Sequence, residues 1–228
     1  MTLAGKGADG LRIGGLTRLT SIDFPGQLAA VVFCQGCPWR CGYCHNPGLL
    51  DAGAPTALAW AQVRSFLQTR VGLLDGVVFS GGEPTLQAAL LPALAEVKAM
   101  GFATGFHTGG MYPERLRAAR PSLDWVGLDI KAPWALYDGV TRTPGSGARA
   151  EQSLKWLLDQ GVPLECRTTW HPGLFESQVL FQLADSLAQQ GVKHWVLQTC
   201  REPGAPAAGL SPADLLALGA RFERFEVR

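Results

Sequence analysis

The sequence predicts an α/β protein with parallel strands, built as an incomplete (β/α)6-type barrel. Short apolar runs of strand length alternate with segments of helical spacing, and this alternation is typical of parallel β/α units. The runs are continuously apolar, as in strands covered on both faces. About six such units fit into the chain, fewer than the eight of a complete barrel. A doubly wound open sheet is the alternative.

The expected strands are apolar runs bounded by residues that favour turns. An extended segment at 11–21 precedes a turn at 23–26, where Pro25 and Gly26 suit a tight reversal. The strands of the repeating pattern are then expected at 28–33, 76–79, 102–106, 125–131, 164–170 and 194–199, with a short final strand at 222–227.

The expected helices fill the intervals between these strands. Their apolar residues recur at helical spacing, and Pro113 and Pro212 occupy the first turn, where proline is tolerated. Ser211 precedes Pro212 as a suitable N-cap. The segment 143–147 is expected to be a flexible loop. The helices are expected at 59–69, 88–100, 113–119, 150–160, 176–190 and from 211 onwards.

Length and composition limit the number of domains and the kinds of partner that we expect. The 228 residues suffice for one sizeable core, so we expect a single domain at 11–228 after a flexible tail at 1–10. The formal charge of +1 gives no electrostatic reason to bind nucleic acid or a membrane surface. No apolar run approaches the roughly 20 residues of a membrane helix, and no signal peptide is visible. We therefore expect a cytoplasmic protein, in which thiols stay reduced.

Four of the six cysteines lie within eleven residues, which indicates a site for a soft metal. Cys37, Cys41 and Cys44 form a C-x3-C-x2-C pattern, and Cys34 lies just upstream. Three thiolates fill three corners of a four-iron cluster and leave one iron open to a substrate. A structural zinc site of four thiolates remains an alternative, although such sites usually separate their cysteine pairs further.

Two smaller patterns in the same loop have other interpretations. The pair Cys41 and Cys44 is spaced like a redox dithiol, but that motif normally opens a helix in a fold without extra cysteines. With His45 it also fits the attachment pattern of c-type haem, which requires export. A disulfide framework is disfavoured in a cytoplasmic chain.

Polar residues recur where the expected strands end. In both candidate architectures, ligands bind at the carboxyl ends of the strands. Any one of these residues has a structural explanation, such as a turn or a salt bridge, but together they predict a ligand site beside the cysteine loop. They are Gly81, Gly82, Glu83, Pro84, His107, Thr108, Asp129, Lys131, Arg167, Thr168, Thr169 and Gln198.

These motifs resemble those of radical S-adenosylmethionine (SAM) enzymes. The three-cysteine pattern, with Tyr43 before its last cysteine, is followed by Gly-Gly-Glu-Pro at 81–84. Within that superfamily, the segments 20–26, 33–37 and 44–47 resemble the activating proteins of glycyl radical enzymes, and most of all the activator of anaerobic ribonucleoside-triphosphate reductase. The resemblance extends from about residue 11 to about residue 198.

The resemblance implies a role for each motif. Cys37, Cys41 and Cys44 would ligate a [4Fe–4S] cluster, whose open iron would bind the amino and carboxylate groups of SAM. The 81–84 motif would receive the methionine amino group, and Tyr43 would lie near the adenine. Positions that contact SAM or a nearby cation in such activators correspond to Thr108, Asp129, Lys131 and Arg167.

The resemblance also implies a reaction. A reduced flavodoxin or ferredoxin would supply an electron, and SAM would be cleaved to methionine and a 5′-deoxyadenosyl radical. That radical would take a hydrogen atom from a backbone glycine of a partner enzyme, here anaerobic ribonucleotide reductase. A small-molecule radical SAM enzyme of the 7-carboxy-7-deazaguanine synthase type is the alternative. That type tends to have an acidic residue after the third cysteine, where this chain has His45. A zinc or redox module without enzymatic activity is a further alternative.

Four residues depart from the activator pattern or lie outside it. We expect Cys34 to be a buried thiol at a strand end and not a ligand. Cys166 and Cys200 are too few and too isolated for a second cluster and are expected to be packed or incidental thiols. His107 stands where the activators have an acidic residue, which leaves cation binding there open.

Overall fold

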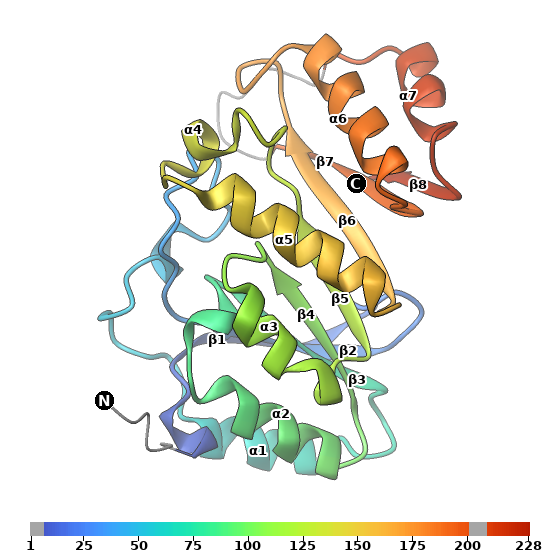
Figure 1. Cartoon of the computed structure of the whole chain (residues 1–228). Helices are drawn as coiled ribbons and strands as arrows, with labels where there is room; N and C mark the ends of the chain where they lie inside the picture. Colours follow the sequence, from blue (N-terminus) through green and yellow to red (C-terminus); the bar gives the residue numbers. More distant parts are fainter. Residues whose placement is uncertain (1–6, 201–208) are drawn as a thin grey trace. The chain divides into compact units, whose positions relative to one another are not determined.

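The computed structural model describes residues 7–200 and 209–228 (Figure 1). These residues form two compact units. Within the described residues, the first unit comprises 7–38, 46–108 and 112–126, and the second comprises 39–45, 109–111, 127–200 and 209–228. Of the tail predicted at 1–10, residues 1–6 lie outside the described residues, and Ala8–Gly10 form a short 3-10 helix, η1.

The first unit contains four consecutive strands of sheet. They are β1 (Ile13–Thr20), β2 (Ala29–Cys34), β3 (Gly76–Gly81) and β4 (Ala103–Thr108). The strands β2, β3 and β4 run parallel, as predicted, with Ala29 opposite Gly76 and Gly76 opposite Ala103. β1 instead runs antiparallel to β2, because the short connection at 21–28 allows only a hairpin return.

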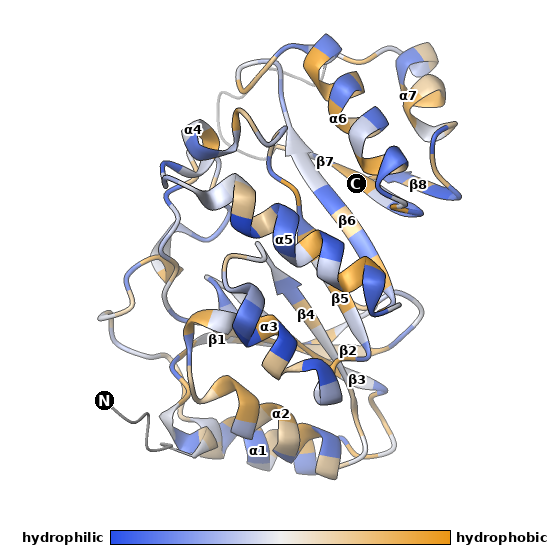
Figure 2. Cartoon of the chain, in the orientation of Figure 1, coloured by the Kyte–Doolittle hydropathy of each residue, from blue (hydrophilic) through white to orange (hydrophobic). Residues whose placement is uncertain are grey.

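The helices of the first unit lie between and after its strands in the sequence. They are α1 (Trp60–Gln68), α2 (Leu90–Ala99) and α3 (Pro113–Ala118), with the 3-10 turns η2 (Pro47–Leu49), η3 (Pro84–Leu86) and η4 (Arg120–Ser122). α1 buries Trp60, Val63 and Leu67, and the Trp60 ring lies 6.2 Å from the Phe79 ring of β3. Figure 2 shows that α2 is hydrophobic along most of its length, and Leu90, Leu94 and Val97 are among its buried residues.

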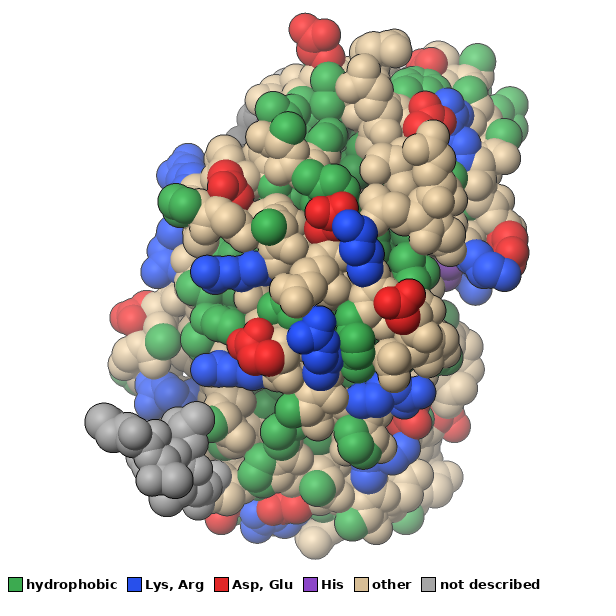
Figure 3. All heavy atoms as spheres, in the orientation of Figure 1, with side chains coloured by type: hydrophobic (Ala, Val, Ile, Leu, Met, Phe, Trp, Pro, Cys, Tyr) green, Lys and Arg blue, Asp and Glu red, His purple; other side chains and the backbone are tan. Residues whose placement is uncertain are grey.

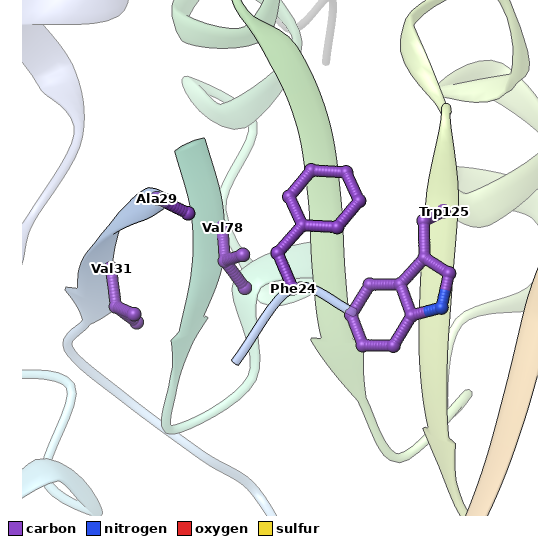
Figure 4. Packing of buried hydrophobic residues seen from close by; sticks show 5 residues of the cluster. All are labelled: Phe24, Ala29, Val31, Val78 and Trp125. Carbon is purple, nitrogen blue, oxygen red and sulfur yellow. The ribbon is translucent and has the colours of Figure 1, made fainter. Parts of the chain in front are cut away.

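The opposite face of this sheet holds a separate hydrophobic cluster (Figure 4). Phe24, from the turn between β1 and β2, stacks on Trp125 at 5.5 Å between ring centroids. Ala29, Val31 and Val78 complete the buried cluster. Because alternate residues of a strand point to opposite faces, the residues between these lie under the helices. Both faces of β2 and β3 are therefore buried, as their continuous apolar runs predict.

The second unit contains the later strands and helices. β5 (Trp125–Asp129) begins in the first unit and ends in the second. β6 (Leu164–Trp170), β7 (His194–Thr199) and β8 (Arg224–Val227) run parallel, with Cys166 opposite Trp195 and Trp195 opposite Phe225. The helices are α4 (Tyr137–Thr141), α5 (Ser146–Asp159), α6 (Ser177–Gln189) and α7 (Pro212–Gly219). None of the helices among the described residues has the length and apolarity that a membrane crossing demands.

One loop prediction is wrong at its end, because only 143–145 lie in the turn between α4 and α5. The segment 143–147 was expected to be flexible, yet Ser146 and Gly147 are buried and belong to α5. The carboxylate of Asp138 accepts hydrogen bonds from the backbone N–H of Gly145 (2.7 Å) and Ser146 (2.9 Å). These N–H groups at a helix start have no partner inside the helix, so a residue of α4 caps α5 and extends it towards its N-terminus.

Candidate active site

The cysteine loop leaves the end of β2 and is anchored by the segment that follows it. In the first unit, the N–H of Gly36 donates to the carbonyl of Leu49 (2.8 Å), and the N–H of Cys37 donates to the carbonyl of Leu50 (3.1 Å). Cys37 itself is partly exposed. The loop backbone is therefore held in place while its thiol stays accessible to a metal.

Two glutamine side chains, which the sequence analysis missed, hydrogen-bond to the backbone around the cysteine loop. The Gln35 amide donates to the carbonyls of Gly48 (3.1 Å) and Asp51 (2.8 Å). The Gln87 amide donates to the carbonyls of Arg12 (2.9 Å) and Gln35 (3.1 Å). Gln35 is buried. A polar amide between Cys34 and Cys37 was the sequence signal that could have identified these contacts, because a buried polar group needs hydrogen-bond partners.

The Gly-Gly-Glu-Pro motif lies against this loop, backbone to backbone. The N–H of Gly82 donates to the carbonyl of Cys34, and the N–H of Glu83 donates to the carbonyl of Gly36, both at 2.9 Å. A Cβ on Gly82 would lie 2.2 Å from the Gly36 oxygen. Gly81 has a φ of +109°, which L side chains rarely adopt. The two glycines thus let the ends of β2 and β3 approach each other closely.

The Glu83 side chain is fully buried and held by two threonines. Its Oε1 accepts from the backbone N–H of Thr85 (3.0 Å) and from the Thr108 hydroxyl (2.8 Å), and the Thr85 hydroxyl donates to the same oxygen. Pro84 begins the 3-10 turn η3. The structure thus brings together the predicted residues Glu83 and Thr108, with Thr108 holding the carboxylate.

The second unit contains Cys41, Tyr43 and Cys44 in one turn. The N–H of Cys44 donates to the carbonyl of Cys41 at 3.2 Å. Both cysteines are free thiols and partly exposed, whereas Tyr43 is buried. Burial raises the pKa of the Cys41 thiol, and the nearby charge of Lys131 opposes that rise. The buried hydroxyl of Tyr43 makes no hydrogen bond within the described part of the chain.

Three charged residues predicted as ligand contacts meet beside this turn. The Asp129 carboxylate pairs with Arg167 at 2.9 Å and with Lys131 at 3.4 Å. The Lys131 ammonium also lies 5.8 Å from the centre of the Tyr43 ring, within range of a cation–π contact. Burial disfavours the charge of Lys131, but Asp129 and Tyr43 raise its pKa well above 10.5. The trio therefore has a net charge of +1 next to Cys41.

His107, Cys34 and Cys166 occupy structural positions. In the first unit, His107 Nε2 lies 2.8 Å from the Asp23 carbonyl, and Nδ1 lies 3.4 Å from the Ser80 hydroxyl. Cys34 is fully buried, and burial raises the pKa of its thiol, which confirms the prediction of a buried thiol. Cys166 is also fully buried, whereas Cys200 is partly exposed.

The residues present suit an iron–sulfur cluster and an anionic ligand. Accessible thiols are the ligands that iron clusters use. The buried Tyr43 hydroxyl, which has no hydrogen-bond partner among the described residues, is a spare donor, and the positive trio suits a carboxylate. That all three cysteines ligate one cluster stays a prediction, because Cys37 belongs to the first unit and Cys41 and Cys44 to the second.

Known proteins with similar sequences belong to a superfamily that fits this site. The sequence matches the radical SAM superfamily over residues 31–180. A protein of Methanocaldococcus jannaschii named as a glycyl-radical enzyme activating enzyme is 28% identical over 182 residues, covering 77% of this chain and 75% of the relative. The pyruvate formate-lyase-activating enzyme of Clostridium pasteurianum is 34% identical over 175 residues, covering 73% and 71%.

A solved structure shows the same fold. SuiB of Streptococcus suis, bound to S-adenosylmethionine, aligns with a TM-score of 0.65 and 14% identity over 85% of this chain. This chain spans about half of SuiB, namely 48% of its length. The incomplete barrel is thereby confirmed as an α/β fold with parallel strands in a sheet that does not close. The chain belongs to the radical SAM superfamily, whose enzymes use a [4Fe–4S] cluster and SAM.

Proposed function

We propose that this enzyme activates a glycyl radical enzyme. Both relatives described above have names that refer to activation of such an enzyme, and this is the observation that carries the proposal. Within the class, we propose anaerobic ribonucleoside-triphosphate reductase as the partner. The support is the sequence around the cysteines, with the segments 20–26, 33–37 and 44–47.

Each residue of the site has a proposed task. Cys37, Cys41 and Cys44 hold the cluster, and Gly81, Gly82 and Pro84 shape the loop that receives the methionine amino group. Tyr43 lies near the adenine of SAM. The buried Glu83, held by Thr108 at 2.8 Å, accepts hydrogen bonds from a positively charged group.

The charged trio has a complementary task. Asp129 orients Arg167 and Lys131 through ion pairs at 2.9 and 3.4 Å, and the net positive charge binds the SAM carboxylate. When bound, the cluster supplies the electron that cleaves SAM to methionine and a 5′-deoxyadenosyl radical. The chain's own residues hold SAM in place and keep water from the site.

We also propose a cytoplasmic location and a reduced flavodoxin or ferredoxin as the electron donor. All six cysteines lie among the described residues and none of them forms a disulfide there, which fits a compartment that keeps thiols reduced.

The test uses anaerobically reconstituted protein reduced with dithionite and mixed with SAM. Wild type should produce 5′-deoxyadenosine, and Cys41→Ala should produce none. Cys34→Ala is the matched control, because Cys34 is fully buried and should leave both iron content and product unchanged. A wild type that forms no 5′-deoxyadenosine refutes the proposal.

The partner is tested by electron paramagnetic resonance. Reduced protein and SAM are incubated with anaerobic ribonucleotide reductase or with pyruvate formate-lyase. A glycyl radical signal on the reductase alone supports the specific proposal. A signal on the lyase alone keeps the class and replaces the partner.

A further inference from the structure

Two buried polar atoms of the cysteine turn have no hydrogen-bond partner among the described residues. They are the indole Nε1 of Trp39 and the hydroxyl of Tyr43, and these residues stand on either side of Cys41 in the sequence. In the described part of the chain, four buried side-chain atoms are without a partner. Because buried polar groups normally find partners, two such atoms beside one predicted ligand point to a group that the site receives.

The Trp39 ring is held in one orientation within the second unit. The side chain is 1% exposed. A Cβ at Gly109 would lie 2.5 Å from Cζ3 of the indole and 3.1 Å from Cη2, so this part of the ring is pressed against the Gly109 backbone. Cζ3 lies across the six-membered ring from the carbon that carries Nε1. The Tyr137 ring meets the indole at 73°, with 5.7 Å between centroids. These contacts fix the ring by the part remote from the N–H.

The known neighbours of the indole do not supply its partner. Tyr137 directs its hydroxyl to the Asp129 carbonyl at 2.9 Å, and Trp134 stacks on Tyr137 at 5.7 Å between centroids. A buried water needs two to four polar partners, which these aromatic rings do not offer. Basic and acidic side chains over α5, in view in Figure 3, are by contrast served by solvent. Since an indole N–H can only donate, the missing partner is an acceptor.

We infer that the Trp39 N–H donates a hydrogen bond to a sulfur of the iron–sulfur cluster or of its cysteine ligands. The inference rests on the proposed task of Cys41 and Cys44, which is to hold that cluster. Hydrogen bonds to the sulfurs are among the features that set the reduction potential of such clusters. Tyr43 faces Lys131 and is proposed to lie near the adenine, so Trp39 is the buried donor left for sulfur.

A donor at sulfur favours the reduced state. Reduction adds one electron, and so one negative charge, while no bond on this chain forms or breaks. The positive end of the N–H dipole stabilises that added charge, and the effect is strong because a buried site screens it weakly. Removal of the N–H should therefore make the reduction potential more negative.

The test compares the reduction potentials of reconstituted proteins by titration followed with electron paramagnetic resonance. Trp39→Phe keeps an aromatic ring and removes the N–H. A second variant carries benzothienylalanine in place of Trp39, which keeps the shape of the indole but has sulfur instead of the N–H. Trp195→Phe is the matched control. Trp195 is fully buried in the same unit, and its N–H donates to the Thr168 hydroxyl at 3.0 Å.

Both changes at Trp39 should lower the ratio of reduced to oxidised cluster about tenfold at a fixed ambient potential. For a one-electron couple, this is a shift of about 59 mV to more negative potential. Trp195→Phe should keep the wild-type ratio, although it also alters a buried aromatic residue. Equal ratios in wild type and the benzothienylalanine variant overturn the inference, because the indole then serves packing alone. Equal shifts in Trp39→Phe and Trp195→Phe overturn it as well.

A measurement on unaltered protein decides the matter even where a variant does not fold or take up iron. Wild type whose tryptophans carry the heavy stable isotope of nitrogen in the indole is reduced and studied by electron–nuclear double resonance. A coupling between the cluster and an indole nitrogen is expected, and its absence overturns the inference. These readouts need neither SAM nor a partner enzyme. Iron-loaded wild type without the coupling thus refutes the donor alone, whereas wild type that forms no 5′-deoxyadenosine with dithionite refutes the proposed function.

Discussion

Replacing Gly82 by alanine tests whether the glycines of the Gly-Gly-Glu-Pro motif serve backbone packing. The added Cβ would lie 2.2 Å from the Gly36 oxygen, 2.7 Å from the Gly36 carbonyl carbon and 3.0 Å from the Leu49 oxygen. All three atoms belong to the backbone, so no side-chain rotation relieves the contact. The loop after β3 must move away from the loop after β2.

The cost follows from two contributions. Overpacking in a close-packed region costs about 1–3 kcal/mol. Displacement also breaks the hydrogen bond from the Glu83 N–H to the Gly36 carbonyl, at 2.9 Å, which contributes about 1 kcal/mol. The sum is about 2–4 kcal/mol of unfolding free energy. In a chain of this size, this corresponds to a fall in Tm of roughly 10 °C.

The assay is thermal unfolding of the metal-free protein, followed by circular dichroism. Gly48→Ala is the matched control. Gly48 also lies in the first unit, a Cβ there meets nothing within 4 Å, and its φ is not positive. Its Tm should stay level or rise slightly, because alanine restricts the unfolded chain. A Gly82→Ala protein with the Tm of wild type would falsify the claim that the close approach of Gly82 to the Gly36 backbone requires glycine at this position.

Three further predictions concern side chains whose partners lie outside their own helix or strand. Thr108→Val removes a donor to the buried Glu83 carboxylate, so unfolding free energy should fall by about 1–2 kcal/mol and SAM affinity should weaken in calorimetry, with Thr108→Ser restoring both. Arg228 contacts the buried Glu165 carboxylate at 3.0 and 3.1 Å, so Arg228→Met leaves that carboxylate without this cation. Urea unfolding should show that the free energy of unfolding falls by about 2–3 kcal/mol, and by less in Arg228→Lys. An unchanged free energy of unfolding would contradict the pairing. Asp138→Asn should lower the Tm at neutral pH, because hydrogen bonds from the N–H groups and the hydroxyl at the start of α5 hold the pKa of Asp138 below 3.8. That stabilisation is complete above pH 3.8 and is lost as the pH falls through the lowered pKa, so the difference in Tm between the two proteins should shrink in acid; a difference that is constant with pH would contradict the role of the carboxylate.

The sequence by itself determined the alternation of strands and helices. Periodicity and turn residues are local signals, and β6 and β7 occupy the predicted 164–170 and 194–199. The Ser211 cap of α7 is equally local, because Ser211 and Asp214 bond to each other across three residues. The cysteine spacing and the Gly-Gly-Glu-Pro motif are likewise contiguous, and they identified the superfamily.

Only the tertiary structure decided which polar groups bond to each other. Thr108 and Glu83 are 25 residues apart, and Gln87 and Gln35 are 52 apart. Such pairs depend on how strand ends converge, which spacing along the chain does not encode. For the same reason, the start of α5 was missed, since its cap Asp138 comes from another helix. The left-handed backbone of Arg142 was equally invisible, because arginine has no local preference for it.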